Sequence, residues 1–396
     1  MDQVKSTRIE SIDILRGLVM VIMALDHVRD YTNTGYMFID PTNLDNTTPG
    51  LFLTRWITHF CAPVFVFLAG TSAFLYGRKK TSKNSLAKFL FTRGLWLVFI
   101  ELTVVNFSWT FDISLGVHIF QVIWAIGICM MLLAALIYIP GRLLLVLGAL
   151  IVIGHNALDG FVSQGNEPLS MLWYFTHQHN FQVINDGQGM LAIAYPFLPW
   201  LGIMILGYCF GYYYQKGFDT QIRKKWLLRF GIGAIVLFFI LRFANVYGDL
   251  KPWETKDSAT YTVLSFINVT KYPPSLIYVL MTLGPALLFL NVIESVKNRI
   301  TSVLVTIGRV PFFYYIIHLY VIHLIGMFGL EFMGENWQEL ILTVDRFKSG
   351  YLFNIGFDLW VTYLVWILVV VLLYPLCKAY MKYKANNRDK WWLSYL

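Results

Sequence analysis

Charged residues are scarce in this chain. Only 14% of its 396 residues are Asp, Glu, Lys or Arg, while 57% are hydrophobic. Soluble globular domains carry about 25% charged residues, so the composition excludes a soluble protein and predicts an all-α protein with several membrane-spanning helices. The net charge of +8 would suggest a nucleic-acid partner for a soluble protein. In a membrane protein, basic residues first report topology, so we expect the lipid bilayer and no nucleic acid as partner.

Cysteine pairs and processing signals are also missing. Each of the four cysteines stands alone inside an apolar segment, which offers neither a disulfide outside the membrane nor a cysteine metal site. The first apolar run contains charges and no small-residue cleavage site follows it, so we expect it to remain as a helix. With no internal repeat or low-complexity linker, the sequence predicts one domain over residues 1–396. The tail, residues 385–396, fits a short interfacial stretch or a frayed terminus.

Ten apolar runs are long enough to cross a bilayer as helices, which takes about 17 to 25 residues. They lie near residues 12–29, 52–77, 88–109, 117–139, 142–159, 191–215, 225–247, 275–294, 302–329 and 354–380. Lys and Arg are concentrated before the first run and after every second one. The positive-inside rule therefore predicts that both termini are cytoplasmic. The outer segment 159–190 has no Lys or Arg, and we expect it to cap an outer opening.

The first run carries Asp13, Arg16, Asp26 and His27 in an otherwise apolar stretch. Each charge left in hydrocarbon costs about 2.5 to 3.5 kcal/mol, and such residues usually mark function. Arg16 and His27 are eleven residues apart, so they share a helix face and are separated by about 16 Å along it. One helix therefore links an inner cation to an outer base. A structural alternative is that Arg16 only pairs with Asp13, three residues away.

The histidines are expected to gather on the outer side. None of the eight falls in a predicted cytoplasmic segment; they are His27, His59, His118, His155, His177, His179, His318 and His323. Any single one could be a packing residue, but neutral imidazole is the side chain best suited to proton transfer near neutral pH. Neighbouring helical residues do not face one another, so we expect the partner of His27 on another helix rather than at Asp26. Candidates are Glu101, Asn106 and Asp358.

Two histidine spacings deserve a test as metal motifs. His177 and His179 flank one residue, and His318 and His323 are five residues apart on a predicted helix. Five helical residues turn the side chains about 140° apart, so the second pair would not chelate from one face. We therefore expect no metal.

The motifs of the chain are similar to those of a known family. They are RIESIDILRGLVMVIMALDHVRDY, ITHFCAPVFVFLAGTSAFLYG, HIFQVIWAIGI, YPFLPWLGIMILGYCFG, YPPSLIYVLMTLGPALL and IGRVPFFYYIIHLYVIHL. Together they resemble bacterial membrane proteins grouped with the catalytic domain of heparan-alpha-glucosaminide N-acetyltransferase. More distantly, LRG followed by a histidine at the end of the first helix is similar to polysaccharide O-acyltransferases.

The resemblance implies a transmembrane acyltransferase-like bundle in the bacterial cytoplasmic membrane. Such a protein takes an acetyl group from cytoplasmic acetyl-CoA and delivers it to an amine or hydroxyl, usually of a sugar, at the other face. Asp26 and His27 fall where the family has polar active-site residues, and Gln121 matches a glutamine in its fourth-helix motif. His59 falls where the resemblance suggests an aspartate in the lysosomal enzyme, whose sequence also differs after His27.

These observations lead to a working hypothesis of transmembrane acetyl transfer. His27 would be the general base, with Asp26 beside it, acting on an acceptor such as glucosamine or another amino sugar or glycan. His59, His118, Gln121 and His318 are candidates for the acceptor or oxyanion side. Residues for the CoA nucleotide and phosphates are Arg16, Arg309, Arg78, Lys79 and Arg93, because guanidinium groups match phosphate geometry.

Three alternatives stay open. A proton-coupled transporter would also use intramembrane Asp, Glu, Arg and His side chains, although the repeated halves common in transporters are not visible. The acetyl group could pass directly to the acceptor or rest first on a histidine. The sequence also leaves open whether the chain forms a homodimer.

Overall fold

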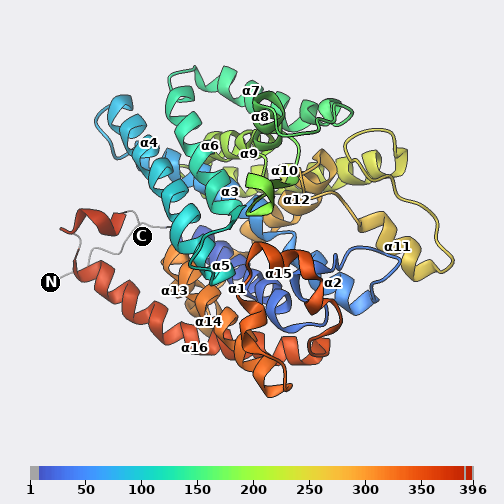
Figure 1. The fold of residues 1–396 in the computed structure, drawn as a ribbon. Helices are drawn as coiled ribbons and strands as arrows, with labels where there is room; N and C mark the ends of the chain where they lie inside the picture. Colours follow the sequence, from blue (N-terminus) through green and yellow to red (C-terminus); the bar gives the residue numbers. More distant parts are fainter. Residues whose placement is uncertain (1–8, 388, 395–396) are drawn as a thin grey trace.

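A computed structural model of the chain describes residues 9–387 and 389–394. Its central element is α1 (Ser11–Thr32), whose side chains are mostly buried. Helices α2, α3, α12, α13, α14 and α16 all pack against it (Figure 1). Asp13 lies in the first turn of α1 and Arg29 in its last turn, which suits the helix dipole at both ends.

The structure is helical almost throughout. The other α-helices are α2 (Pro49–Thr58), α3 (Cys61–Gly77), α4 (Lys83–Ile100), α5 (Asn106–Thr110), α6 (Val122–Leu136), α7 (Gly141–Gly154), α8 (Pro168–Thr176), α9 (Phe197–Phe210), α10 (Thr220–Ala244), α11 (Ala259–Ile267), α12 (Leu276–Ile293), α13 (Arg299–Gly308), α14 (Pro311–Phe332), α15 (Val344–Ser349) and α16 (Leu359–Asn386). Short helical turns are η1 (Tyr36–Phe38), the π-helical η2 (Glu101–Val105), η3 (His155–Leu158), η4 (Asn185–Gly187), η5 (Gly211–Tyr214), η6 (Trp337–Leu340), η7 (Tyr351–Asn354) and η8 (Trp391–Ser394).

The predicted all-α membrane fold is confirmed. Within the described residues, seven continuous helical stretches are long and apolar enough to cross a membrane: 49–77, 83–110, 141–158, 220–244, 276–293, 311–332 and 359–386. The first joins α2 and α3, the second runs from α4 through η2 to α5, and the third joins α7 and η3. The remaining predicted spans correspond to α1, which is long but carries several charges, and to the shorter α6 and α9. The count of ten and the cytoplasmic position of both termini stay predictions.

Three predicted spans differ in detail from the structure. The run 302–329 is two helices, because α13 ends at Gly308 and Pro311 starts α14. The runs that were expected to begin at 117 and 191 begin instead as strands, β1 (Val117–Phe120) and β3 (Gly189–Ile193). Apolar residues alone could not distinguish a strand that leads into a helix from the helix itself. Of the tail, 391–394 form η8, while 388, 395 and 396 lie outside the described residues.

Glycines set the closest helix crossings. A Cβ on Gly17 of α1 would lie 2.0 Å from the Leu304 carbonyl oxygen, and one on Gly308 of α13 would lie 1.9 Å from that of Asp13. Gly207 of α9 meets Phe67 of α3 in the same way, at 2.0 Å. Small residues let helix backbones approach closely where lipid supplies no hydrophobic drive. The α1–α13 crossing therefore fixes the beginning of α1.

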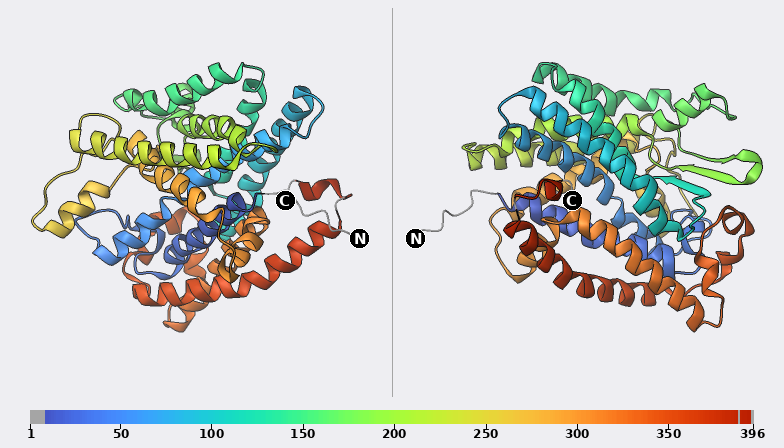
Figure 2. Two further views of the ribbon diagram at one scale, coloured as in Figure 1. Left: turned by 180° about the vertical axis from the view of Figure 1, so that it is seen from behind. Right: turned by 60° about the vertical axis from the view of Figure 1, so that its left-hand side comes forward.

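A small three-stranded sheet lies at the opposite end of the bundle from the beginning of α1 (Figure 2, right). β3 is its middle strand, parallel to β1 and antiparallel to β2 (Asn180–Ile184). Phe120 pairs with Ile193 at the carboxyl ends of the two parallel strands. The residues that follow both strands are therefore delivered to one edge of the sheet, next to the C-terminal half of α1.

Candidate active site

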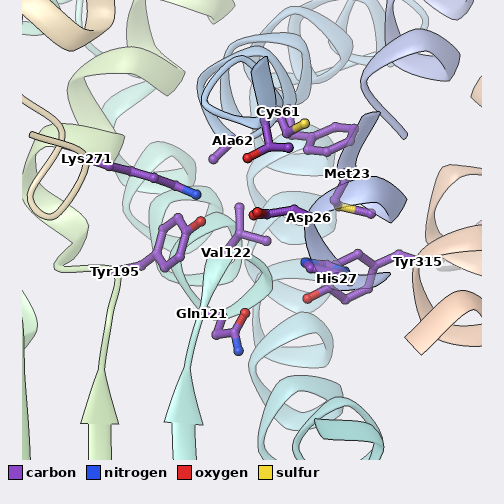
Figure 3. A pocket seen from close by; sticks show the side chains of 12 residues that line it. Met23, Asp26, His27, Cys61, Ala62, Gln121, Val122, Tyr195, Lys271 and Tyr315 are labelled. Carbon is purple, nitrogen blue, oxygen red and sulfur yellow. The ribbon is translucent and has the colours of Figure 1, made fainter. Parts of the chain in front are cut away.

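A cavity of about 360 Å³, including its open mouth, lies beside the C-terminal half of α1 (Figure 3). Its walls come from α1, α14, the region where α2 meets α3, the edge of the sheet, and the segment that precedes α12. The lining residues are Met23, Asp26, His27, Thr58, Cys61, Ala62, Phe65, Gln121, Val122, Tyr195, Lys271 and Tyr315. Three of the predicted site residues, Asp26, His27 and Gln121, thus line one cavity.

The sheet delivers two polar side chains to this cavity. Gln121 directly follows β1, and Tyr195 comes two residues after β3. In Figure 3 both strands point toward the cavity, and both side chains reach it. The backbone N–H of Gln121 donates to Oε1 of Glu101, at 2.9 Å. Glu101 is fully buried in the π-helical η2, so its carboxyl group anchors the start of α6 rather than orienting His27.

His27 is paired with His318 of α14. Their Nδ1 and Nε2 atoms, respectively, lie 2.7 Å apart, and Nδ1 of His318 lies 2.9 Å from the carbonyl oxygen of Tyr314. Both histidines are buried, at 8% and 0% exposure. The partner of His27 is therefore on another helix, as expected, but it is none of the three candidates. Asn106 instead bonds the backbone of Val117 and Ile119.

The Tyr314 carbonyl fixes the protons of the histidine pair. A carbonyl oxygen only accepts, so Nδ1 of His318 carries the hydrogen and its Nε2, with the ring neutral, is an acceptor. Nδ1 of His27 must then donate to it. In a neutral His27 this leaves Nε2 with a free electron pair, and among the described contacts no hydrogen bond engages that atom. In this arrangement Nε2 of a neutral His27 is free to accept a hydrogen bond.

Asp26 belongs to an ionic network rather than to the histidine pair. Its Oδ1 accepts from Arg29 at 3.1 Å, and its Oδ2 is ion-paired with Arg55 of α2. Arg29 also pairs with Asp30 at 2.6 Å. The described contacts include no hydrogen bond between Asp26 and His27. Since both its oxygens are engaged, Asp26 orients two arginines and contributes negative charge to one wall of the cavity.

Lys271 brings a positive charge into the cavity. Its side chain is 8% exposed, and in Figure 3 its amino group points to the space between Tyr195 and Asp26. Nζ lies 5.0 Å from the centre of the Tyr272 ring and 6.0 Å from that of Tyr195. Burial raises the pKa of Tyr195 well above its ordinary value. Burial would do the same at Tyr272, but the adjacent Lys271 and Arg55 cations outweigh it and lower that pKa.

The three predicted acceptor-side histidines, His59, His118 and His318, lie outside the lining set. His59 is buried between α2 and α3, where its ring contacts Tyr278 edge-on at 5.5 Å and its carbonyl accepts from the Tyr278 hydroxyl at 2.7 Å. His118 is half-buried on β1. The neighbours of His59, Thr58 and Cys61, line the cavity in its place. Their positions in the apolar runs correctly placed His59 and His118 at the same end of the bundle as the cavity, but could not show which way their side chains face.

Arg16 and Arg309 meet at the other end of α1, where both approach Asp13. Arg16 donates to Asp13 at 3.3 Å, to Ser72 at 3.0 Å and to the Gly308 carbonyl at 3.2 Å. Arg309 pairs with Glu10 at 3.0 Å and lies 3.5 Å from Asp13. The two predicted phosphate ligands are therefore close together, and the pairing of Arg16 with Asp13 is also present.

The other predicted CoA residues lie on α3 and α4. Arg78 and Lys79 follow the end of α3 and are exposed, and Arg93 is half-buried on α4. Arg16 contacts Ser72 of α3. Arg78 comes six residues after Ser72, so it lies about 9 Å farther along the axis of α3. Arg78 and Lys79 thus extend from the Arg16 end of α1 toward the surface.

Sequence reasoning missed Lys271, Tyr195, Tyr315 and Arg55 as site residues. Lys271 lies just before the run 275–294, whereas Arg55, Tyr195 and Tyr315 lie inside the runs 52–77, 191–215 and 302–329. Basic and tyrosine side chains are common at such positions in membrane proteins, so they gave only a weak signal. Only the packing of α1 against α2, α12 and α14 brings these side chains to the same cavity.

Comparison with known families gives a match to the N-terminal part of the chain. The model of the family described as heparan-alpha-glucosaminide N-acetyltransferase, catalytic, matches residues 8–241, more than half of the chain. The matched part includes α1, α2, α3 and the sheet, and so contains Asp26, His27, Gln121 and Tyr195. No curated protein gives a significant match to the chain.

Proposed function

The chain belongs to the heparan-alpha-glucosaminide N-acetyltransferase catalytic-domain family, and from that premise we propose that it transfers an acetyl group from cytoplasmic acetyl-CoA to an amino sugar or glycan at the outer face. The family indicates a transmembrane acetyltransferase in general. The donor, the acceptor and the direction of transfer are the parts proposed for this chain.

The hydrogen-bond order of the histidine pair supports this proposal most strongly. Nε2 of His27 has a free electron pair at the cavity, because Nδ1 donates to His318 and His318 donates to Tyr314. In the proposed reaction Nε2 removes a proton from the acceptor amine or hydroxyl, whose oxygen or nitrogen then attacks the thioester carbonyl. When the CoA thiolate leaves, the protonated His27 returns the proton to its sulfur.

The cation and hydroxyl across the cavity would stabilise the negative charge of this reaction. Attack on a thioester places charge on the carbonyl oxygen, and preorganised donors in a dry site are the usual means of stabilising it. Lys271, Tyr195 and Gln121 are polar side chains of the cavity that could donate to that oxygen. We assign Asp26 and Arg55 a positioning role, because their mutual ion pair holds the wall from which His27 projects.

The beginning of α1 is the proposed entrance for acetyl-CoA. Arg16, which shares Asp13 with Arg309, is about three turns from His27 along α1, a distance that a pantetheine arm can span. For phosphates to bind, Arg16 and Arg309 would exchange part of their contacts with Asp13 and Glu10 for phosphate oxygens. Arg78, Lys79 and Arg93 would add positive potential at this mouth. The basic residues of this end support a cytoplasmic position.

An acetyl-transfer assay with purified protein tests the function. Wild-type protein in detergent, given radiolabelled acetyl-CoA and glucosamine, is expected to form acetylated product. His27→Ala should lower the rate about 10²- to 10⁴-fold, the usual contribution of a general base, while acetyl-CoA binding measured by calorimetry persists. His118→Ala is the matched control, since it removes a half-buried histidine that does not line the cavity. Near-normal turnover by His27→Ala would remove His27 from the mechanism.

A further inference from the structure

A second group of ionisable side chains lies away from the cavity just described. His155 of η3, Asp159 directly after it and His177 directly after α8 place their ligand atoms within 4.8 Å of one another. Both histidines are buried, at 3% and 1% exposure. We propose that these three residues form a binding site for a divalent transition metal of the zinc type. The sequence had predicted no metal, since it offered only the weak spacings of His177 with His179 and of His318 with His323.

His155 is the residue that points to a ligand. Neither of its ring nitrogens has a hydrogen-bond partner of normal geometry, although the side chain is almost fully buried. A buried polar group without a partner is costly, and native structures rarely leave one. The backbone carbonyl of Pro274 lies beside the ring. A hydrogen bond from one nitrogen to that carbonyl would leave the other nitrogen for a metal, the common arrangement for ligating histidines.

The other two residues complete a plausible ligand set. Nε2 of His177 lies 3.1 Å from Oδ1 of Asp159, and Nδ1 of His177 is without a partner. Zinc takes nitrogen and oxygen ligands at about 2.0 to 2.2 Å, so two ligands of one ion are at most about 4.4 Å apart. Small rotations of the side chains would therefore close the present spacing. Two imidazoles and one carboxylate favour zinc over magnesium or calcium, which prefer oxygen ligands.

The surroundings of the three residues indicate a structural role for the metal. Nδ2 of Asn156 donates to Oδ2 of Asp159 at 2.8 Å, and Oδ1 of Asn156 accepts from the backbone N–H of Leu276 at 2.9 Å. The site thus joins the end of α7, the end of α8 and the start of α12. That last segment follows Lys271, which lines the cavity. A bound metal would fasten the segment 155–177 to the chain that carries Lys271.

Metal binding to the purified protein tests the proposal. After treatment with EDTA and its removal, wild-type protein in detergent is titrated with Zn²⁺ in competition with a fluorescent chelator, and with Co²⁺ followed by its visible absorption. We expect one Zn²⁺ per chain, little competition from Mg²⁺, and a Co²⁺ spectrum typical of four- or five-coordinate ligation. Zn²⁺ should also raise the thermal unfolding midpoint.

Variants identify the ligands. His155→Gln and His177→Gln should each weaken Zn²⁺ binding at least about 100-fold, because loss of even a second-shell partner costs 10- to 100-fold. His179→Gln, at an exposed histidine two residues from His177, should bind as wild type does. If His155→Gln does not fold, His177→Gln decides the question. Wild-type protein without a Zn²⁺ site of micromolar or higher affinity, or equal affinities in all four proteins, would overturn the proposal. Because binding is measured without acetyl transfer, the result is independent of the proposed function.

Discussion

Replacing His318 with Ala isolates the effect of the histidine pair on catalysis. The variant leaves Nε2 of His27 in place but removes the atom that accepts from its Nδ1–H, at 2.7 Å in the structure. A buried donor left without an acceptor costs about 1 to 3 kcal/mol. His27 avoids this cost by carrying its proton on Nε2 instead, where the proposed mechanism needs a free electron pair. The productive tautomer is then disfavoured by about the same amount.

That energy converts into a measurable rate. A penalty of about 1 to 3 kcal/mol corresponds to a decrease in kcat of about 5- to 150-fold, which is smaller than the loss expected for His27→Ala. His318→Gln should be milder than His318→Ala, since the amide oxygen of Gln can accept from Nδ1–H. The KM for acetyl-CoA should change little, because His318 is far from the arginines proposed to bind CoA.

The assay is acetyl transfer to glucosamine at saturating acetyl-CoA, measured over a range of pH. The rate should rise with pH in wild type and in both His318 variants, since His27 must be deprotonated, and this dependence should be absent in His27→Ala. Adding His318→Ala to His27→Ala should cause no further loss, because the two residues act through one atom. Wild-type kcat in His318→Ala, with the protein folded, would refute the assigned hydrogen-bond order.

Two further predictions concern the ends of the proposed path. Lys271→Met should lower kcat about 10²- to 10³-fold, the usual effect of removing an oxyanion donor, and Lys271→Arg should retain part of the activity. Equal rates in Lys271→Met and wild type would exclude the lysine from charge stabilisation. Arg16→Ala and Arg309→Ala should weaken acetyl-CoA binding in calorimetry, with partial rescue by Lys because the planar guanidinium is lost. Unchanged affinity in both Ala variants would place the CoA phosphates elsewhere.

Much of the fold could be read from apolar run lengths, because a bilayer requires about 20 apolar residues per helix. Where the prediction was wrong, run length carried no information on local breaks. The run 302–329 contains Gly308 and Pro311, which end one helix and start the next. The runs that begin at 117 and 191 start with strands. Run length could not reveal them, because β-branched and aromatic residues before a helix are equally apolar in either conformation.

The sequence could predict those site residues that stand out within a single apolar run or motif. His27 and Asp26 stand out because they are ionisable residues in an apolar run, and Gln121 was found by its motif. His318 was named for the oxyanion side, yet the structure pairs it with His27, because α14 packs against α1 and faces it there. Lys271 and Tyr195 come from connections between elements. Their positions depend on the tertiary fold, which no local pattern specifies.

The metal residues illustrate the same limit. His155 and His177 are separated by 22 residues, and no common metal motif has that spacing. Only the return of the chain through α8 brings them within 4.8 Å of each other and of Asp159. Periodicity along one helix could not predict this contact, because it depends on how the segment 159–176 folds back.

Transfer across a sealed membrane tests the central claim most directly. Protein is reconstituted into vesicles, and its orientation is determined by labelling single-cysteine variants in segments 78–88 and 160–190 with a membrane-impermeant reagent. Acetyl-CoA supplied only on the side of segment 78–88, with glucosamine only on the side of segment 160–190, should give acetylglucosamine on the glucosamine side, and His27→Ala vesicles should give almost none. Product formed only when both substrates are on the same side, or equal product from His27→Ala, would contradict transmembrane transfer through His27.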